Sequence, residues 1–152
     1  MQLTKTYKDI HETMKFLYIQ IKDSLEYADA WLPSGIKTPS ELYSILKANT
    51  VFINDGKDEI LQEMPTLMDQ NLNVWGVAGG GDCDCFTISV SACCLILNFK
   101  TKIVLAGRSQ HTPVHIYNLV YDQGVWCPFD LTNRFYKEVR KYPYTQNLPV
   151  LR

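Results

Sequence analysis

Apolar residues recur at intervals of three and four over residues 7–31, and Lys, Asp and Glu fill the positions between them. This is the period of an amphipathic helix with one side buried. The segment therefore predicts a long helix that packs on a core through one stripe of residues: Ile10, Met14, Leu17, Ile21, Leu25 and Ala28.

A second helix is predicted after the break "PSGIK" at residues 33–37. In the motif "TPSE", Thr38 suits the N-cap, Pro39 suits the first helical position, and Glu41 can reach back to complete a capping box. Residues Thr50 to Gly56 ("TVFINDG") read as a short extended piece that ends in a turn. A short helix followed by a loop is expected after Pro65.

The run from Phe86 to Phe99 is predominantly apolar. Its length fits a buried helix of about three turns, although "FTISV" alone also fits a strand. The glycines at 79–81 and the length favour the helix, with the glycines acting as a hinge in front of it.

After Lys102 the segments "KIVLAG", "PVHIYNLVY" and "VWCPFDL" are rich in β-formers, and "YDQGV" is a hairpin signal. Helices first and strands second predict an α+β fold, in which helices pack on a C-terminal antiparallel sheet. We expect one domain over residues 1–152. Within it, residues 1–32 form a packing helix and residues 138–152 form a loosely packed extension.

Composition agrees with one globular core: the chain has 152 residues, 46% of them hydrophobic, and a net charge of -1. Scattered basic residues predict no nucleic-acid partner and no membrane partner. The first twenty residues lack the pattern of a signal peptide, so we expect a cytoplasmic protein. Four of the five cysteines fall within residues 83–94, a poor disulfide framework that indicates a reducing compartment.

The stretch "GGGDCDCF" places Cys83 at the predicted start of the buried helix. The unpaired backbone N–H groups of a helix N-terminus favour a thiolate, which is the nucleophilic form of cysteine. Cys83 is therefore a candidate nucleophile, and its own N–H group is a candidate donor to an oxyanion.

A base and its orienting group are predicted from the hairpin. If Val120 pairs with Val125, then His115 pairs directly with Asp130, and both side chains lie on one face. A slip of one residue would turn Asp130 to the other face. Cys83, His115 and Asp130 would then form a nucleophile, base and orienter.

Simpler roles are expected for the other chemical groups. Cys93, Cys94 and Cys127 fit small core residues, and His11 and His111 fit structural or surface positions. A zinc site built from Cys83, Cys85, Cys93, Cys94 and His115 lacks the usual Cys-x2-Cys spacing, so no metal is predicted. Asp82 suits an N-cap, and Asp84 suits a first-turn acid that complements the helix dipole.

The motifs "GDCDCF" and "HIYNLVYDQGVWCPFDLT", with the helix and Pro-led segment before them, resemble the transglutaminase-like superfamily of papain-type cysteine enzymes over about residues 39–133. The resemblance implies a triad of Cys83, His115 and Asp130, with the cysteine on a helix packed against an antiparallel sheet. The small size is most similar to phage and prophage members. Cys85 stands where many members carry a second Asp, and the oxyanion side chain has three candidates: Trp75, Asn73 and Gln70.

These observations predict a cysteine-dependent hydrolase or acyl transferase that acts on the amide bonds of a peptide or protein and needs no cofactor. The alternative is a catalytically silent module that serves as a binding or structural component, such as part of a phage particle. In that case an exposed aromatic surface that includes Tyr136, Tyr142 and Tyr144 would carry the interaction, unless these tyrosines only pack the surface and the tail.

Overall fold

The computed structural model describes residues 2–5, 10–52, 59–62, 64–65, 67–68, 79–81, 83–109 and 113–151. Its helices are α1 (Ile10–Trp31), α2 (Pro39–Ala48) and α4 (Cys83–Leu97). The principal sheet has the order β7-β6-β5-β8 and consists of β5 (Thr101–Gly107), β6 (Pro113–Asp122), β7 (Val125–Phe129) and β8 (Tyr144–Pro149). All three pairings in it are antiparallel, so the predicted α+β fold is confirmed.

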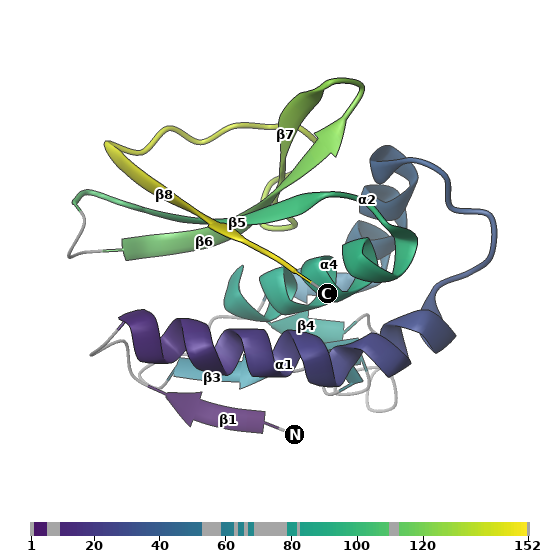
Figure 1. Cartoon of the computed structure of the whole chain (residues 1–152), viewed down its shortest axis with the longest axis horizontal. Coiled ribbons are helices and arrows are strands. Elements are labelled where there is room, and N and C mark those ends of the chain that lie inside the picture. Colours follow the sequence, from purple (N-terminus) through teal and green to yellow (C-terminus); the bar gives the residue numbers. More distant parts are fainter. Residues whose placement is uncertain are drawn as a thin grey trace.

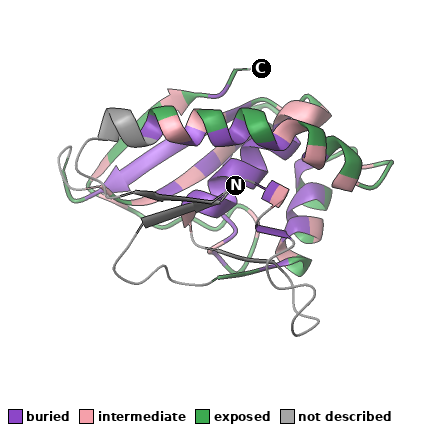
Figure 2. Ribbon diagram, turned by 90° about the horizontal axis from the view of Figure 1, so that it is seen from below, coloured by how far each residue is buried: buried purple, intermediate pink, exposed green. Residues whose placement is uncertain are grey.

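The molecule is layered, with the principal sheet on one side of α4 and α1 on the other (Figure 1). Every residue of α4 from Asp84 to Cys94 is buried, including the polar Asp84, Thr87, Ser89 and Ser91. In Figure 2 this helix lies inside the molecule, while α1 shows alternating buried and exposed residues. The α4 helix is therefore the centre of the fold.

The predicted stripe of α1 is confirmed where its side chains are described. Met14, Leu17 and Ile21 pack with Ile88 of α4 and with the sheet residues Ile103, Leu105 and Ile116. Ala28 belongs to a second cluster with α2 and the other side of α4. None of the helices in the described ranges is both long and apolar enough to cross a membrane.

The start of α2 follows the sequence closely. The Thr38 side chain accepts a hydrogen bond from the Glu41 N–H at 3.2 Å, and Pro39 occupies the first turn. The Glu41 carboxylate accepts from the Lys37 N–H rather than from that of the N-cap, so the capping box closes one residue earlier than predicted.

Two small ladders were not predicted. β1 (Gln2–Lys5) pairs antiparallel with β3 (Glu59–Gln62), and β2 (Thr50–Phe52) pairs parallel with β4 (Gly79–Gly81). The three glycines are thus extended and paired, and the expectation of a sharp hinge there was wrong. The rest of the predicted extended piece, residues 53–56, lies outside the described residues, whereas 64, 65, 67 and 68 are helical as expected after Pro65.

The C-terminal tail is where the structure differs most from the prediction. Residues 138–152 were expected to pack loosely, yet β8 pairs with β5 over six residues, from Gly107–Tyr144 to Lys102–Pro149. Its exposed residues Thr145, Gln146 and Asn147 carry no apolar alternation. An edge strand can be held mainly by main-chain hydrogen bonds, which leave little trace in the side-chain pattern.

Candidate active site

Cys83 is the first residue of α4, and it is the only one of the five cysteines that is not buried. Its position at the helix N-terminus places it beside the N–H groups that favour a thiolate. Its Sγ donates to Oδ1 of Asp84 at 3.7 Å, and Asp84 is only 2% exposed. The thiol therefore lies beside a buried carboxylate on the next residue of the helix.

The imidazole of His115 meets the carboxylate of Asp130, with His115 Nε2 and Asp130 Oδ2 separated by 2.6 Å. The two side chains are 9% and 5% exposed. The other oxygen of Asp130, Oδ1, accepts from the N–H of Thr132 at 3.0 Å and from its hydroxyl at 2.7 Å. Both oxygens are therefore engaged, which fixes the carboxylate.

The environment of Asp130 favours its charged form. Burial raises the pKa of this carboxyl group, but the hydrogen bond and charge of His115 and the two hydrogen bonds of Thr132 outweigh it. The net pKa is lowered from its ordinary value. Asp130 is thus held as an anion beside the imidazole.

The predicted hairpin register was wrong by two residues. Asp122 pairs with Val125 and Val120 pairs with Cys127, so Asp130 comes to lie beyond the Asn118–Phe129 pair. The cause is a two-residue turn in which Gln123 and Gly124 have φ values of 52° and 85°, as a tight turn matched to the strand twist requires. A slip of two residues preserves the face, so His115 and Asp130 still meet as diagonal neighbours.

Two tyrosines hold the His115 ring. Tyr117 stacks on it with ring centroids 5.6 Å apart, and Tyr142 stacks at 5.9 Å from the segment before β8. With Nε2 engaged by Asp130, Nδ1 is the ring nitrogen left to exchange a proton with a reacting group.

Cys83, Tyr117 and Asp130 line one crevice, which is too narrow for a water molecule. The positions of β6 that face α4 are Ile116, Asn118 and Val120, so His115 and Tyr117 belong to the alternate set. Both groups that contact His115, the Tyr117 ring and Asp130, nevertheless border the same crevice as the thiol. The crevice is therefore bordered by the thiol and by the partner carboxylate of His115, while His115 itself does not line it.

Helix α2 supports the loop that carries Asp130. The Tyr43 hydroxyl lies 3.2 Å from the carbonyl of Asp130 and donates to that of Asn133 at 2.8 Å, and Lys47 Nζ donates to the Leu131 carbonyl at 2.6 Å. Burial, with smaller contributions from the charges of Asp130 and Glu138, raises the pKa of Tyr43 to about 12, so its hydroxyl stays protonated as a donor.

Sequence reasoning missed Tyr43, Lys47 and Thr132, and it named Tyr142 only as part of an exposed aromatic surface. Only Thr132 carried a local signal, because an Asp followed two residues later by a donor is typical of an Asx turn. Tyr43 lies 87 residues from Asp130 in the chain, so no local pattern could have linked them.

The structure also shows where the other four cysteines, Asp84 and two of the predicted surface tyrosines lie. Cys85, Cys93, Cys94 and Cys127 are buried, which confirms the expectation of core packing for the last three. Asp84 lies in the first turn of α4, as predicted. Tyr136 and Tyr142 are partly buried and engaged rather than freely exposed, since Tyr136 donates to Asp122 and Tyr142 stacks on His115.

Several candidates lie outside the described residues: Gln70, Asn73, Trp75, Asp82, His111 and the side chain of His11. Within the part of the chain that the structure describes, no group of three or more His, Cys, Asp or Glu residues is arranged to hold a metal ion.

Comparison with known proteins gives a distant likeness. No protein-family model matches the chain, and no curated protein matches it. A solved structure of a candidate cysteine protease from Cytophaga hutchinsonii is similar over 85% of this chain, with 16% identity and a TM-score of 0.47. A solved transglutaminase (TGase) is similar over 90% of this chain, with 14% identity and a TM-score of 0.40. The chain spans less than half of either protein, covering 44% and 37% of their lengths.

Proposed function

We propose that this protein is a cysteine-dependent hydrolase or acyl transferase that acts on amide bonds. The observation that carries the proposal is the His115–Asp130 pair, because its carboxylate borders the same crevice as the thiol at the N-terminus of α4. The resemblance of the "GDCDCF" and "HIYNLVY" motifs to transglutaminase-like enzymes supports the same reading.

The chemistry has two stages. His115 Nδ1 takes the proton of Cys83, and the sulfur forms a bond to the carbonyl carbon of the amide. The carbon–nitrogen bond then breaks as His115 returns the proton to the leaving amine, which produces a thioester. Water or a second amine then gives its proton to His115 and bonds to the thioester carbon, and the carbon–sulfur bond breaks as His115 returns the proton to the sulfur.

Each group has a defined role in these steps. Asp130 keeps the imidazole oriented and stabilises its charge while it holds the proton. The N–H groups at the start of α4 are directed toward the oxyanion that forms beside the sulfur. The substrate must approach from the exposed side of Cys83, because the crevice between the thiol and the sheet is closed.

A test of the proposal uses a library of peptides and peptidoglycan fragments incubated with the wild type, with Cys83→Ala and with Cys94→Ala as the matched control. We expect amide cleavage or amine exchange with the wild type and with Cys94→Ala, and a loss of at least about a thousandfold with Cys83→Ala. A covalent adduct on Cys83, detected by intact-protein mass spectrometry, would identify the thioester.

A catalytically silent module is the rival, and the closed crevice together with the Tyr142 ring stacked on His115 is the observation that favours it. In that case neither cleavage nor an adduct forms, and Cys83→Ala behaves as the wild type does. That outcome would reject the proposed activity.

A further inference from the structure

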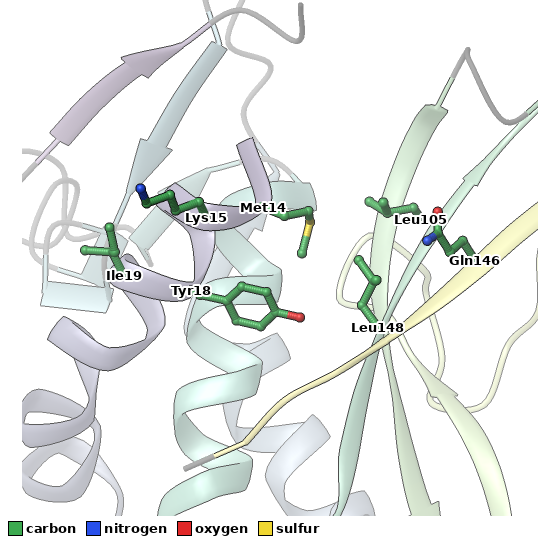
Figure 3. A pocket seen from close by; sticks show the side chains of 7 residues that line it. All are labelled: Met14, Lys15, Tyr18, Ile19, Leu105, Gln146 and Leu148. Atoms are coloured by element: carbon green, nitrogen blue, oxygen red, sulfur yellow. The ribbon is translucent and has the colours of Figure 1, made fainter. Parts of the chain in front are cut away.

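An open apolar groove separates α1 from the edge of the principal sheet (Figure 3). Its first pocket, of about 510 Å³, lies between Met14, Tyr18 and Ile19 of α1 and the sheet residues Leu105 and Leu148. A second pocket, of about 700 Å³, continues past Tyr18 between Ile21 and Leu25 on one side and Val150 and Leu151 on the other. We call the two together the α1–β8 groove.

A single hydrogen bond divides the groove. The Tyr18 hydroxyl donates to the Pro149 carbonyl at 2.7 Å, and Tyr18 lines both pockets. The groove therefore consists of two apolar pockets in a row with a partition between them. A ligand that fills both must place one apolar group on each side of Tyr18.

The sheet edge beside the groove is open to pairing. β8 is hydrogen-bonded to β5 on one side and is the last strand in the order of the principal sheet, so within the described residues its other edge has no partner strand. An unpaired edge offers main-chain N–H and C=O groups to an added extended chain. Alternate side chains of such a chain would point toward α1 and into the pockets.

The dimensions fit a short extended segment. From Met14 to Leu25 the rise along α1 is about 16 Å at 1.5 Å per residue. An extended chain covers that length in about five residues at 3.3 Å per residue. Residues two apart in such a chain lie on the same face, about 7 Å apart, which suits one side chain in each pocket.

The charged residues that line the two pockets in the described part of the chain are all basic. Among the described residues that line the two pockets, only Lys15 and Lys22 are charged, and both are exposed on α1. They are two helical turns apart, or about 10 Å. Cationic side chains at the rim of an apolar groove favour a ligand that combines apolar groups with carboxylates.

We propose that the α1–β8 groove binds an extended, acidic peptide segment by adding it to the free edge of β8. Two apolar side chains at alternate positions fill the pockets on either side of Tyr18, and carboxylates of the same segment face Lys15 and Lys22. This binding function does not depend on the reactivity of Cys83, so it stands or falls separately from the proposed enzyme activity.

The test measures fluorescence anisotropy with a labelled nonapeptide in which Val or Leu alternates with Glu. We expect saturable binding to the full chain, and equal binding to Cys83→Ala. The double variant Lys15→Glu/Lys22→Glu should weaken binding by at least about tenfold, whereas Lys37→Glu/Lys100→Glu, which makes the same change of charge elsewhere, should not.

A second pair of variants tests the apolar part. Ile19 is 42% exposed on the rim of the first pocket, so Ile19→Glu should fold normally and weaken binding at least about tenfold. Val139, which is 61% exposed and outside the groove, supplies the control Val139→Glu. Circular dichroism spectra identical to that of the wild type would show that each variant is folded.

Modified peptides distinguish main-chain pairing with β8 from binding through side chains alone. Methylation of alternate backbone nitrogens on the edge that meets β8 should abolish binding, and replacing every Glu by Lys should do the same. Equal binding of the methylated peptide, indifference to the groove variants, or no binding at millimolar concentration would overturn the proposal. Binding of dodecanoate but of no peptide, or self-association of the chain that Ile19→Glu abolishes, would also overturn it by identifying a different occupant.

Discussion

The two ends of α4 carry the same functional group in opposite environments. At the N-terminus, Cys83 is partly exposed and lies beside a narrow crevice that Asp130 also borders. Ten residues later, Cys93 and Cys94 are fully buried, and burial raises the pKa of Cys94 to about 12 and that of Cys93 well above its usual range. Position on the helix therefore decides which thiol is exposed.

This contrast has a structural cause. The part of α4 from Asp84 to Cys94 is enclosed between α1, α2 and the sheet, so a thiol there acts as a small apolar side chain. At the N-terminal end of the helix only Cys83 is partly exposed, and there the unpaired N–H groups act on it. A buried helix can therefore present one reactive group at its end while the rest of it holds the fold together.

The largest expected effect is a difference in alkylation between the two ends. A brief pulse of iodoacetamide on the folded protein should modify Cys83 at least about a thousandfold faster than Cys93 or Cys94, because the buried thiols react only when the structure opens. Peptide mapping by mass spectrometry measures all three rates in one sample. Similar alkylation rates at Cys83 and Cys94 would contradict the contrast between the two positions.

The second effect isolates the base. His115→Ala should lower the rate of Cys83 alkylation at neutral pH by about tenfold to a hundredfold, since the thiolate then loses its proton acceptor. The rates of Cys93 and Cys94 in denaturant should stay the same. His11→Ala is the matched control, and an equal loss in that variant would point to a general effect of losing an imidazole.

The third effect concerns Asp130 and has a defined dependence on pH. Its pKa is lowered in the folded state, so the ionised carboxylate stabilises the protein above the ordinary carboxyl pKa, and this contribution is lost as the pH falls through the lowered value. Asp130→Asn should therefore cost about 1.5 to 3 kcal/mol of the free energy of unfolding at pH 7.

Urea denaturation of Asp130→Asn and the wild type over a range of pH measures this. The difference between them should be constant from about pH 5 to 7 and should shrink below about pH 4. A difference that grows on acidification would contradict the assignment of Asp130 as a stabilised anion.

The smallest effect concerns the aromatic stack. Tyr142→Phe keeps a ring over His115 and should leave Cys83 alkylation unchanged. Tyr142→Leu removes the stack, which is worth about 0.5 to 1.5 kcal/mol, and should lower the rate only a few-fold. Faster alkylation of Tyr142→Leu would instead show that Tyr142 obstructs the site.

The helices were predictable because their signals are local. The apolar stripe of α1 predicts that one side of this helix is buried, and the mostly apolar sequence of α4 predicts burial on all sides. The hairpin was partly predictable: the strands and the shared face of His115 and Asp130 were correct, but the register required the turn geometry of Gln123 and Gly124. Because side chains alternate between the two faces of a strand, a shift of two residues keeps each side chain on its face. The alternating pattern therefore does not fix the register.

The parts that were missed depend on partners distant in sequence. β8 has a polar sequence, and only its pairing with β5 reveals it as a strand. Gly79–Gly81 carries no side-chain signal, and its pairing partner β2 lies nearly thirty residues earlier. The contact of Tyr43 with the Asp130 loop likewise exists only after α2 has docked.

The central claim is that His115 and Asp130 activate the thiol at the start of α4. The most direct test is the rate of Cys83 alkylation as a function of pH. We predict that the rate reaches half of its maximum well below the pH of about 8.5 expected for a free thiol, and that the midpoint rises toward that value in His115→Ala and, by less, in Asp130→Asn. A midpoint near 8.5 in all three proteins would contradict the account.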